Sequence, residues 1–194
     1  MLDAIVYILH GHVFATAMTG NTVLLCVSLL AGDTAQALRH FSPLVTFSCG
    51  ILLGWAILRH LPQPGRAHRV ALLFQMIALL VAGAASANFP SPPIVVLVAI
   101  TASVQIATFQ KLDKVTYNTT FITGNFRTLL EAAYDRIFDA DKQAANAQLR
   151  MIAAVCFGFV IGALLGAFIA PQLHNHSLWL ADLVLLTVFL LLNL

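Results

Sequence analysis

Long apolar runs without charged side chains restrict the fold of this chain more than any other feature. Four of them contain 17 to 20 residues each, at positions 41–58, 70–87, 151–170 and 178–194. A helix needs about 20 residues to cross the hydrocarbon core of a bilayer, with a range of roughly 17 to 25. Each run is therefore predicted to be a membrane-spanning helix. Only the last carries a charge, Asp182, which we expect at the membrane rim.

The composition also indicates a polytopic membrane protein whose main partner is the lipid bilayer. Of 194 residues, 60% are hydrophobic and 9% are charged, whereas soluble domains contain about 25% charged residues. The net charge of +2 is too small to indicate a nucleic-acid partner. The motifs of nucleotide-binding loops, zinc proteases and serine hydrolases are absent from the sequence. We therefore expect no enzyme, no bound metal and no cofactor.

Two further apolar segments, residues 2–30 and 94–130, are interrupted by polar residues. The second is too long for one straight span, and charged residues lie near its centre at 111–114. We expect a first part at 94–109, an irregular polar stretch, and a second part at about 119–130. Alternatively, the first part crosses the membrane alone, the charged residues form a cytoplasmic loop, and the second part is re-entrant. Counting each interrupted segment once, the chain has six membrane-crossing units.

The distribution of lysine and arginine indicates the orientation of these units. The loops after the second and fourth units are rich in arginine, whereas residues 88–93 and 171–177 contain neither lysine nor arginine. The loop expected at 32–40 contains only Arg39. Cytoplasmic loops carry an excess of Lys and Arg. Because rich and poor loops alternate, both termini are predicted to be cytoplasmic.

The tripeptide Thr-Gly-Asn occurs twice, at positions 19–21 and 123–125, each time within an apolar segment. Three spans in each half is an odd number, so two homologous halves must insert with opposite orientations, as inverted repeats. We predict an all-α polytopic membrane protein with a single transmembrane domain over residues 1–194. Its two three-helix repeats cover residues 1–87 and 94–194, and each begins with a discontinuous helix.

A second motif, Gly-x3-Gly, also recurs, as Gly50 and Gly54 in the second span and as Gly158 and Gly162 in the fifth. Small residues at this spacing allow two membrane helices to approach closely. We expect these glycines to pair the second span with the fifth, either within one chain or across a homodimer.

The two interrupted helices are the predicted binding site. Thr and Asn are preferred at helix N-termini, and the free N–H groups at such an end favour an anion. In hydrocarbon, irregular backbone is tolerated only where it is buried in protein or lines a cavity. Alternatively, the glycines serve close packing and the Thr and Asn side chains bond to neighbouring helices. The predicted substrate-binding residues are Thr19, Gly20, Asn21, Thr123, Gly124 and Asn125, together with Asp3, Gln105 and Lys111.

An ordered set of short motifs resembles the YoaK-like family of bacterial inner-membrane proteins, a six-helix domain of unknown function. These motifs are Asp3-Ala4, Thr19-Gly20-Asn21-Thr22, Gln105-x-Ala107 and Thr119-Thr120-x-x-Thr123-Gly124. The resemblance covers essentially the whole chain. It implies a multi-pass protein of the bacterial inner (cytoplasmic) membrane, and it implies no particular substrate.

The chain differs from this family at two places. The family usually has Gln-Asn-Ala where this chain has Gln105-Ile106-Ala107, and it has several apolar residues ahead of Asp-Ala, where this chain has only Met1 and Leu2. We expect that the first helix is short or that the chain starts late relative to its ancestor.

Two classes of function fit these features. The first is a small-solute transporter or permease, with an anionic solute bound between the two interrupted helices. The alternative is a non-transporting membrane protein with a structural, assembly or sensor role, in which the interruptions only set the packing.

The predicted topology can be tested by labelling introduced cysteines from outside the cell. Positions near Ser91 and Asn175 should react, because their loops lack lysine and arginine, whereas Gln63 and Gln143 should not. Labelling of Gln63 from the exterior would reverse the assignment.

Overall fold

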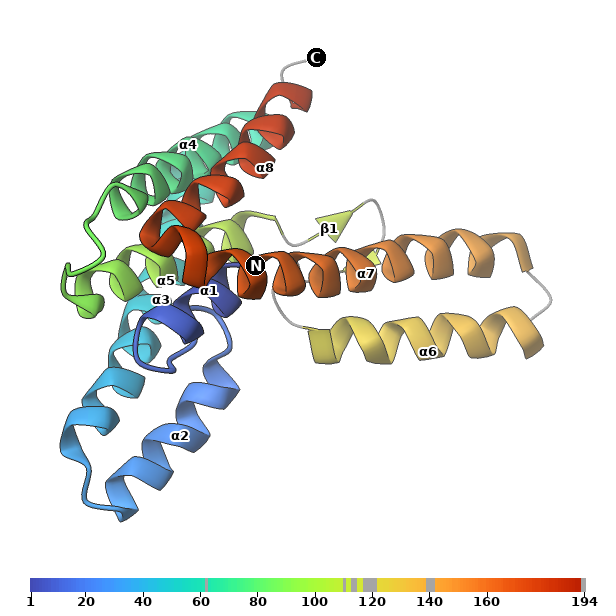
Figure 1. The fold of residues 1–194 in the computed structure, drawn as a ribbon. Coiled ribbons are helices and arrows are strands. Elements are labelled where there is room, and N and C mark those ends of the chain that lie inside the picture. The colour runs from blue at the N-terminus through green and yellow to red at the C-terminus, as the bar shows by residue number, and fades with distance from the viewer. Residues whose placement is uncertain (62, 110, 113–114, 117–121, 139–141, 193–194) are drawn as a thin grey trace. The chain divides into compact units, whose positions relative to one another are not determined.

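The computed structural model describes residues 1–61, 63–109, 111–112, 115–116, 122–138 and 142–192. The chain forms two compact units (Figure 1). Unit 1 contains Met1–Phe109 and Ala163–Leu194, and unit 2 contains Gln110–Gly162.

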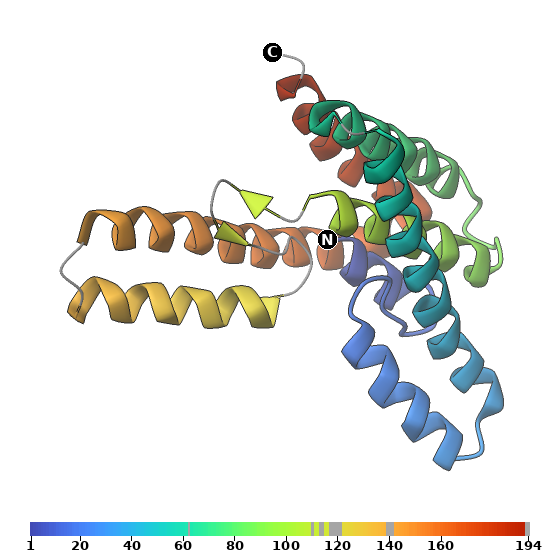
Figure 2. The ribbon, with the colours of Figure 1, turned by 180° about the vertical axis from the view of Figure 1, so that it is seen from behind.

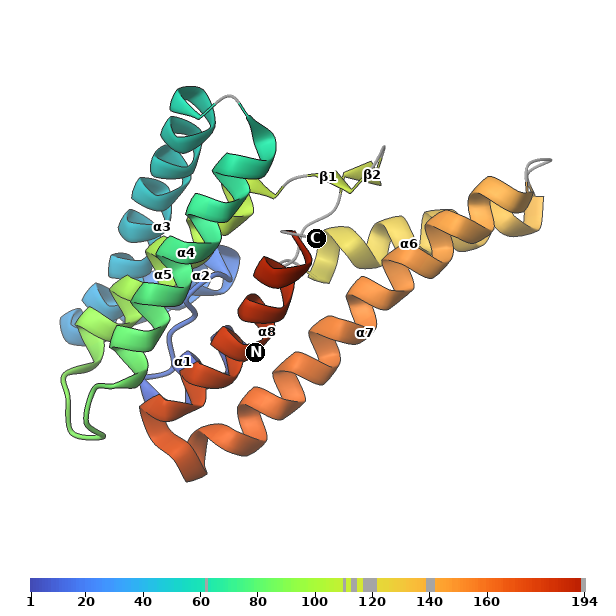
Figure 3. The same cartoon turned by 90° about the horizontal axis from the view of Figure 1, so that it is seen from above.

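Unit 1 is a set of apolar helices with one interruption near its start. Its helices are α1 (Leu2–Leu9), α2 (Met18–Leu30), α3 (Thr34–His60), α4 (Pro64–Gly83), α5 (Ser91–Thr108), the 3-10 helix η1 (His174–Ser177) and α8 (Leu178–Leu191). α7 (Lys142–Leu173) begins in unit 2 and ends in unit 1. Helix α5 packs against both α3 and α4 (Figure 3), and α2 packs along α3 (Figure 2).

These helices confirm the all-α class and the presence of membrane-spanning helices. Four segments are apolar and long enough to cross a membrane: Thr34–His60, Gly65–Gly83, Ser91–Thr108 and Asn146–Leu191. The last includes α7 and α8 with the η1 turn between them. The arrangement of six units as two inverted repeats stays a prediction.

The start of α3 differs from our expectation of a loop over residues 32–40. The helix begins at Thr34 because Asp33 caps it, with the Asp33 carboxylate accepting a hydrogen bond from the Gln36 N–H at 2.9 Å. A capping side chain satisfies one of the N–H groups that have no partner within the helix. The expected loop is thus the first two turns of a longer helix.

Helix α5 favours the second of our two interpretations of residues 94–130, because it is by itself apolar and long enough to cross a membrane. In unit 2, two short strands follow it, β1 (Lys111–Leu112) and β2 (Val115–Thr116), paired antiparallel. The next helix, α6 (Ile122–Phe138), extends eight residues beyond Leu130, where we expected the fourth unit to end. Asp113 and Lys114 lie outside the described residues.

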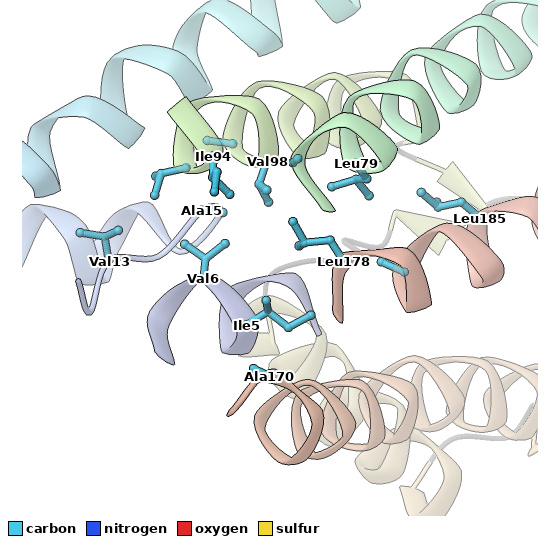
Figure 4. Packing of buried hydrophobic residues seen from close by; sticks show 14 of the residues in the cluster. Ile5, Val6, Val13, Ala15, Leu79, Ile94, Val98, Ala170, Leu178 and Leu185 are labelled. Carbon is cyan, nitrogen blue, oxygen red and sulfur yellow. The ribbon is translucent and has the colours of Figure 1, made fainter. Parts of the chain in front are cut away.

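Unit 1 has a core to which the interruption itself contributes. Val13 and Ala15, from the irregular segment, are buried with Val6 of α1 and Ile94 of α5 (Figure 4). Side chains from α4, from α8 and from the end of α7 complete this cluster: Leu79, Leu178, Leu185 and Ala170. The irregular segment is therefore held inside protein, as irregular backbone in a membrane must be.

The glycines of α3 pack against α5, and not against the fifth span as we expected. A Cβ added to Gly50 would lie 2.5 Å from the Ile100 carbonyl oxygen, and one added to Gly54 would lie 2.5 Å from Ala107 Cβ. Gly158 in α7 is different, since a Cβ there would meet no atom within 4 Å. A homodimer through the glycine face of α7 stays a prediction.

The two loops without lysine or arginine lie at the same end of unit 1. Asn175 in η1 donates hydrogen bonds from Nδ2 to the carbonyl oxygens of Ala85 and Ser86, at 3.3 and 3.0 Å. At the other end, His68 Nε2 lies 3.0 Å from the carbonyl oxygen of Thr108. This arrangement agrees with the alternation of loop charges. Because Asn175 is buried and His174 is exposed, His174 is the better labelling position.

The α3–α5 contact predicts unequal effects of alanine at two glycines. Gly50→Ala should lower the free energy of unfolding by about 1–3 kcal/mol, because the methyl group forces the two backbones apart. Gly158→Ala is the matched control, and the absence of neighbours predicts no loss. Thermal unfolding in detergent measures both variants. Equal stability of the two proteins would contradict the close packing of α3 on α5.

Candidate functional site

The first interruption, residues 10–17, separates α1 from α2 and contains the expected break in the helix. The chain turns at Gly11 and His12, whose φ angles are +80° and +59°. This left-handed region suits glycine, and histidine is one of the few other residues that adopt it more often than average. The His12 ring stacks on Tyr7 at a centroid distance of 5.0 Å, and Tyr7 stacks on Phe14 at 4.9 Å. These stacked rings hold the turn against α1.

Side chains from the flanking helices satisfy the backbone of this segment. Asn21 in α2 binds both backbone groups of Phe14, accepting from its N–H at 3.0 Å and donating to its carbonyl at 2.7 Å. Asp3 in α1 accepts from the N–H and the hydroxyl of Thr16, at 2.8 and 2.5 Å. Buried backbone groups need such partners when secondary structure does not supply them.

These contacts refine the predicted roles of the first Thr-Gly-Asn. The three residues are the second to fourth of α2, and Ala17 occupies the N-cap. No side chain caps this end. Thr19 is exposed, Gly20 lies against the Phe14 ring, and Asn21 is fully buried. Asn21 and Asp3 thus hold the break in place, and substrate binding by these residues stays a prediction.

The second Thr-Gly-Asn occupies the same positions in α6, as the second to fourth residues of the helix. Thr123 and Gly124 are exposed, and Asn125 is buried. Gly124 belongs to unit 2 and Gly20 to unit 1, so the predicted convergence of the two breaks stays a prediction.

The remaining two predicted residues lie near the second interruption. Gln105 is a half-buried residue in the last turn of α5. Lys111 opens β1, and its side chain lies outside the described part of the structure.

The structure adds residues from the start of α3 that the sequence analysis missed. Gln36 donates a hydrogen bond to the Gly11 carbonyl at 2.9 Å. The buried His40 places Nδ1 3.5 Å from Asn21 Oδ1 and Nε2 3.1 Å from Gln36 Nε2. A Cβ on Gly11 would lie 3.1 Å from Arg39 Nη1. Gln36, Arg39 and His40 have the spacing of one helix face. This pattern was missed because residues 32–40 were assigned to a loop.

His10 fixes the level of the break. Its Nδ1 lies 3.2 Å from the hydroxyl oxygen of Ser91, the first residue of α5. The break therefore lies near the start of α5. Among the residues that the structure describes, no three His, Cys, Asp or Glu side chains are grouped closely enough to hold a metal ion.

Comparisons with known proteins agree with this architecture. Residues 1–191 match the model of a family described as "Protein of unknown function (DUF1275)", and the chain belongs to that family. It is 25% identical over 193 residues to the UPF0700 transmembrane protein YoaK of Bacillus subtilis (strain 168), with 92% of this chain and 82% of that protein covered. No solved structure matches the chain. The family resemblance seen in the sequence is confirmed, and the chain is a membrane protein.

The contacts of Asn21 predict that it matters for stability. Asn21→Leu should lower the free energy of unfolding by about 1–3 kcal/mol, because the Phe14 N–H and carbonyl lose their partner in a buried place. Thr19→Ala, two residues away and exposed, is the control. Thermal unfolding in detergent compares the two variants. An Asn21→Leu protein as stable as the control would show that the hydrogen bonds between Asn21 and Phe14 are dispensable.

Proposed function

We propose that this member of the DUF1275 family is a small-solute transporter or permease of the bacterial cytoplasmic membrane. Its solute is an anion, bound at the break between α1 and α2. The proposal assigns no enzymatic activity and no cofactor to the chain.

The interrupted helix supports a transporter. Paired discontinuous helices point to the binding sites of secondary transporters. In this chain the first interruption is ordered by specific contacts from Asp3, Asn21 and Gln36. Such a segment presents backbone groups and polar side chains together.

The positive charge of Arg39 at the break is the main support for an anionic solute. Its guanidinium lies against Gly11, and it forms no ion pair with the residues that the structure describes. His12 belongs to this turn and His40 lies beside it, and a ring N–H of either can donate a hydrogen bond to an anion. The N-terminus of α2, which no side chain caps, adds the positive end of a helix dipole.

The helix pairs of unit 1 support inverted repeats over residues 1–87 and 94–194. Helix α3 uses Gly50 and Gly54 to approach α5, and α7 uses Gly166 to approach Met1, where a Cβ would lie 2.7 Å from the Met1 carbonyl oxygen. In the predicted repeats α3 corresponds to α7, and α5 corresponds to α1, which begins one residue after Met1. Helix α4 pairs with α8, its own counterpart. With the loop charges, this favours a multi-pass topology with both termini in the cytoplasm.

A non-transporting role, as a structural, assembly or sensor protein, is the second candidate. The hydrogen bonds of Asp3 and Asn21 favour it, because these side chains already use their polar atoms on the backbone of Phe14 and Thr16. A break stabilised in this way can serve packing alone.

A ligand screen tests anion binding at the break. The purified protein is heated in detergent with inorganic phosphate, sulfate, acetate or succinate. One of these at about 100 times its dissociation constant should stabilise the protein by about 2.7 kcal/mol. Arg39→Gln should remove that stabilisation. Arg150→Gln, an exposed arginine in α7, should keep it.

Uptake of the stabilising anion into proteoliposomes then separates the two candidate functions. A transporter takes the labelled anion into the vesicles, and Arg39→Gln reduces uptake. Binding without uptake would favour a sensor. If no anion stabilises the protein, or if Arg39→Gln responds like Arg150→Gln, the proposed anion site is wrong.

A further inference from the structure

An apolar groove runs along the contact between α4 and α8 in unit 1. Its cavity has a volume of about 620 Å³. The lining includes Met76 and Leu80 from α4, and Trp179, Asp182, Leu183 and Leu186 from α8. The lining is apolar except for Asp182 and His176, so the groove suits a molecule that is both apolar and charged.

Asp182 is buried without a partner, where we expected a residue at the membrane rim. Its exposed fraction is 6%, and neither carboxylate oxygen has a hydrogen-bond partner among the described residues. On α8, Leu178, Ala181 and Leu185 are buried with it. A carboxylate in apolar surroundings is costly unless a positive group compensates it.

The elements around the groove supply no such positive group from the residues that the structure describes. The α4 residues of the lining, Met76 and Leu80, are apolar. His176 of η1 lines one end, but its Nδ1 lies 2.7 Å from the carbonyl oxygen of Gly83, and its ring packs on Trp179. A carboxyl group in such a place is either protonated or paired with a positive charge, and a cation that enters the groove from outside would supply that charge.

Trp179 forms a fixed aromatic wall of this groove. Its Nε1–H donates to the Leu80 carbonyl oxygen at 3.2 Å. Gly83 leaves room for the indole, since a Cβ there would lie 2.5 Å from Trp179 Cδ1. Aromatic rings attract cations through their π-electrons, and a carboxylate attracts them more strongly where water is excluded.

We propose that the groove between α4 and α8 binds a hydrophobic organic cation, such as a quaternary phosphonium or ammonium ion. The apolar side chains bury its hydrocarbon groups, and Asp182 supplies the opposite charge. This site is separate from the break between α1 and α2, and the proposal does not rest on anion transport.

Two probe ions of the same shape and opposite charge test it. In the full-length protein with Trp55→Phe, Trp179 is the remaining tryptophan. Tetraphenylphosphonium should quench its fluorescence saturably in detergent, and tetraphenylborate should bind at least tenfold more weakly. Asp182→Asn should weaken phosphonium binding at least tenfold. Asp135→Asn, which removes a carboxylate from the exposed face of α6, is the matched control and should change nothing.

Several outcomes would overturn the proposal. They are the absence of saturable quenching, equal affinity for the two ions, or equal phosphonium affinity in Asp182→Asn and Asp135→Asn. Equal affinity for the phosphonium and the borate would show that the groove binds apolar molecules regardless of charge, as it would bind lipid chains. If circular dichroism shows that Asp182→Asn does not fold, Met76→Phe decides instead. It narrows the groove and keeps the charge, so it should also weaken phosphonium binding at least tenfold, and unchanged binding would refute the site.

Discussion

The arrangement of unit 1 depends on the hydrogen bonds between the Asn21 amide and the backbone of Phe14. In apolar surroundings a backbone N–H or carbonyl without a partner costs several kcal/mol. A helix avoids this cost with its own hydrogen bonds, whereas the segment between α1 and α2 cannot. One asparagine and one aspartate replace the missing bonds at Phe14 and Thr16. As a result, Val13 and Ala15 can enter the core.

Small residues decide which apolar helices meet. Lipid chains are as apolar as leucine, so hydrophobicity alone does not drive membrane helices together, and close packing does. Gly50 and Gly54 bring α3 onto α5, Gly83 admits the Trp179 ring, and Gly166 lies against Met1. The same ring then forms a wall of the groove at Asp182. Gly83, Trp179 and the groove beside Asp182 are therefore parts of one contact between α4 and α8.

Much of the element order could be predicted from charge and hydropathy. The apolar runs correspond to α3, α4, α7 and α8, because hydrocarbon excludes charged side chains and a helix must be long enough to cross it. The ends of the helices were predicted less accurately. Residues 34–40 contain an arginine and three polar residues, so their helix is not visible as an apolar run. The missed turns of α3 supply Gln36, Arg39 and His40 to the break.

The sequence by itself determined the class of protein, the break before the first Thr-Gly-Asn, and the presence of paired motifs in the two halves. Each of these follows from local composition, spacing or repetition. The tertiary structure decided which groups those motifs bind. Asn21 binds Phe14, the glycines of α3 face α5, and Asp182 lies buried beside an apolar groove. A sequence shows that a carboxylate lies in an apolar run, but only the packing of a neighbouring helix determines whether it meets water, a partner or neither.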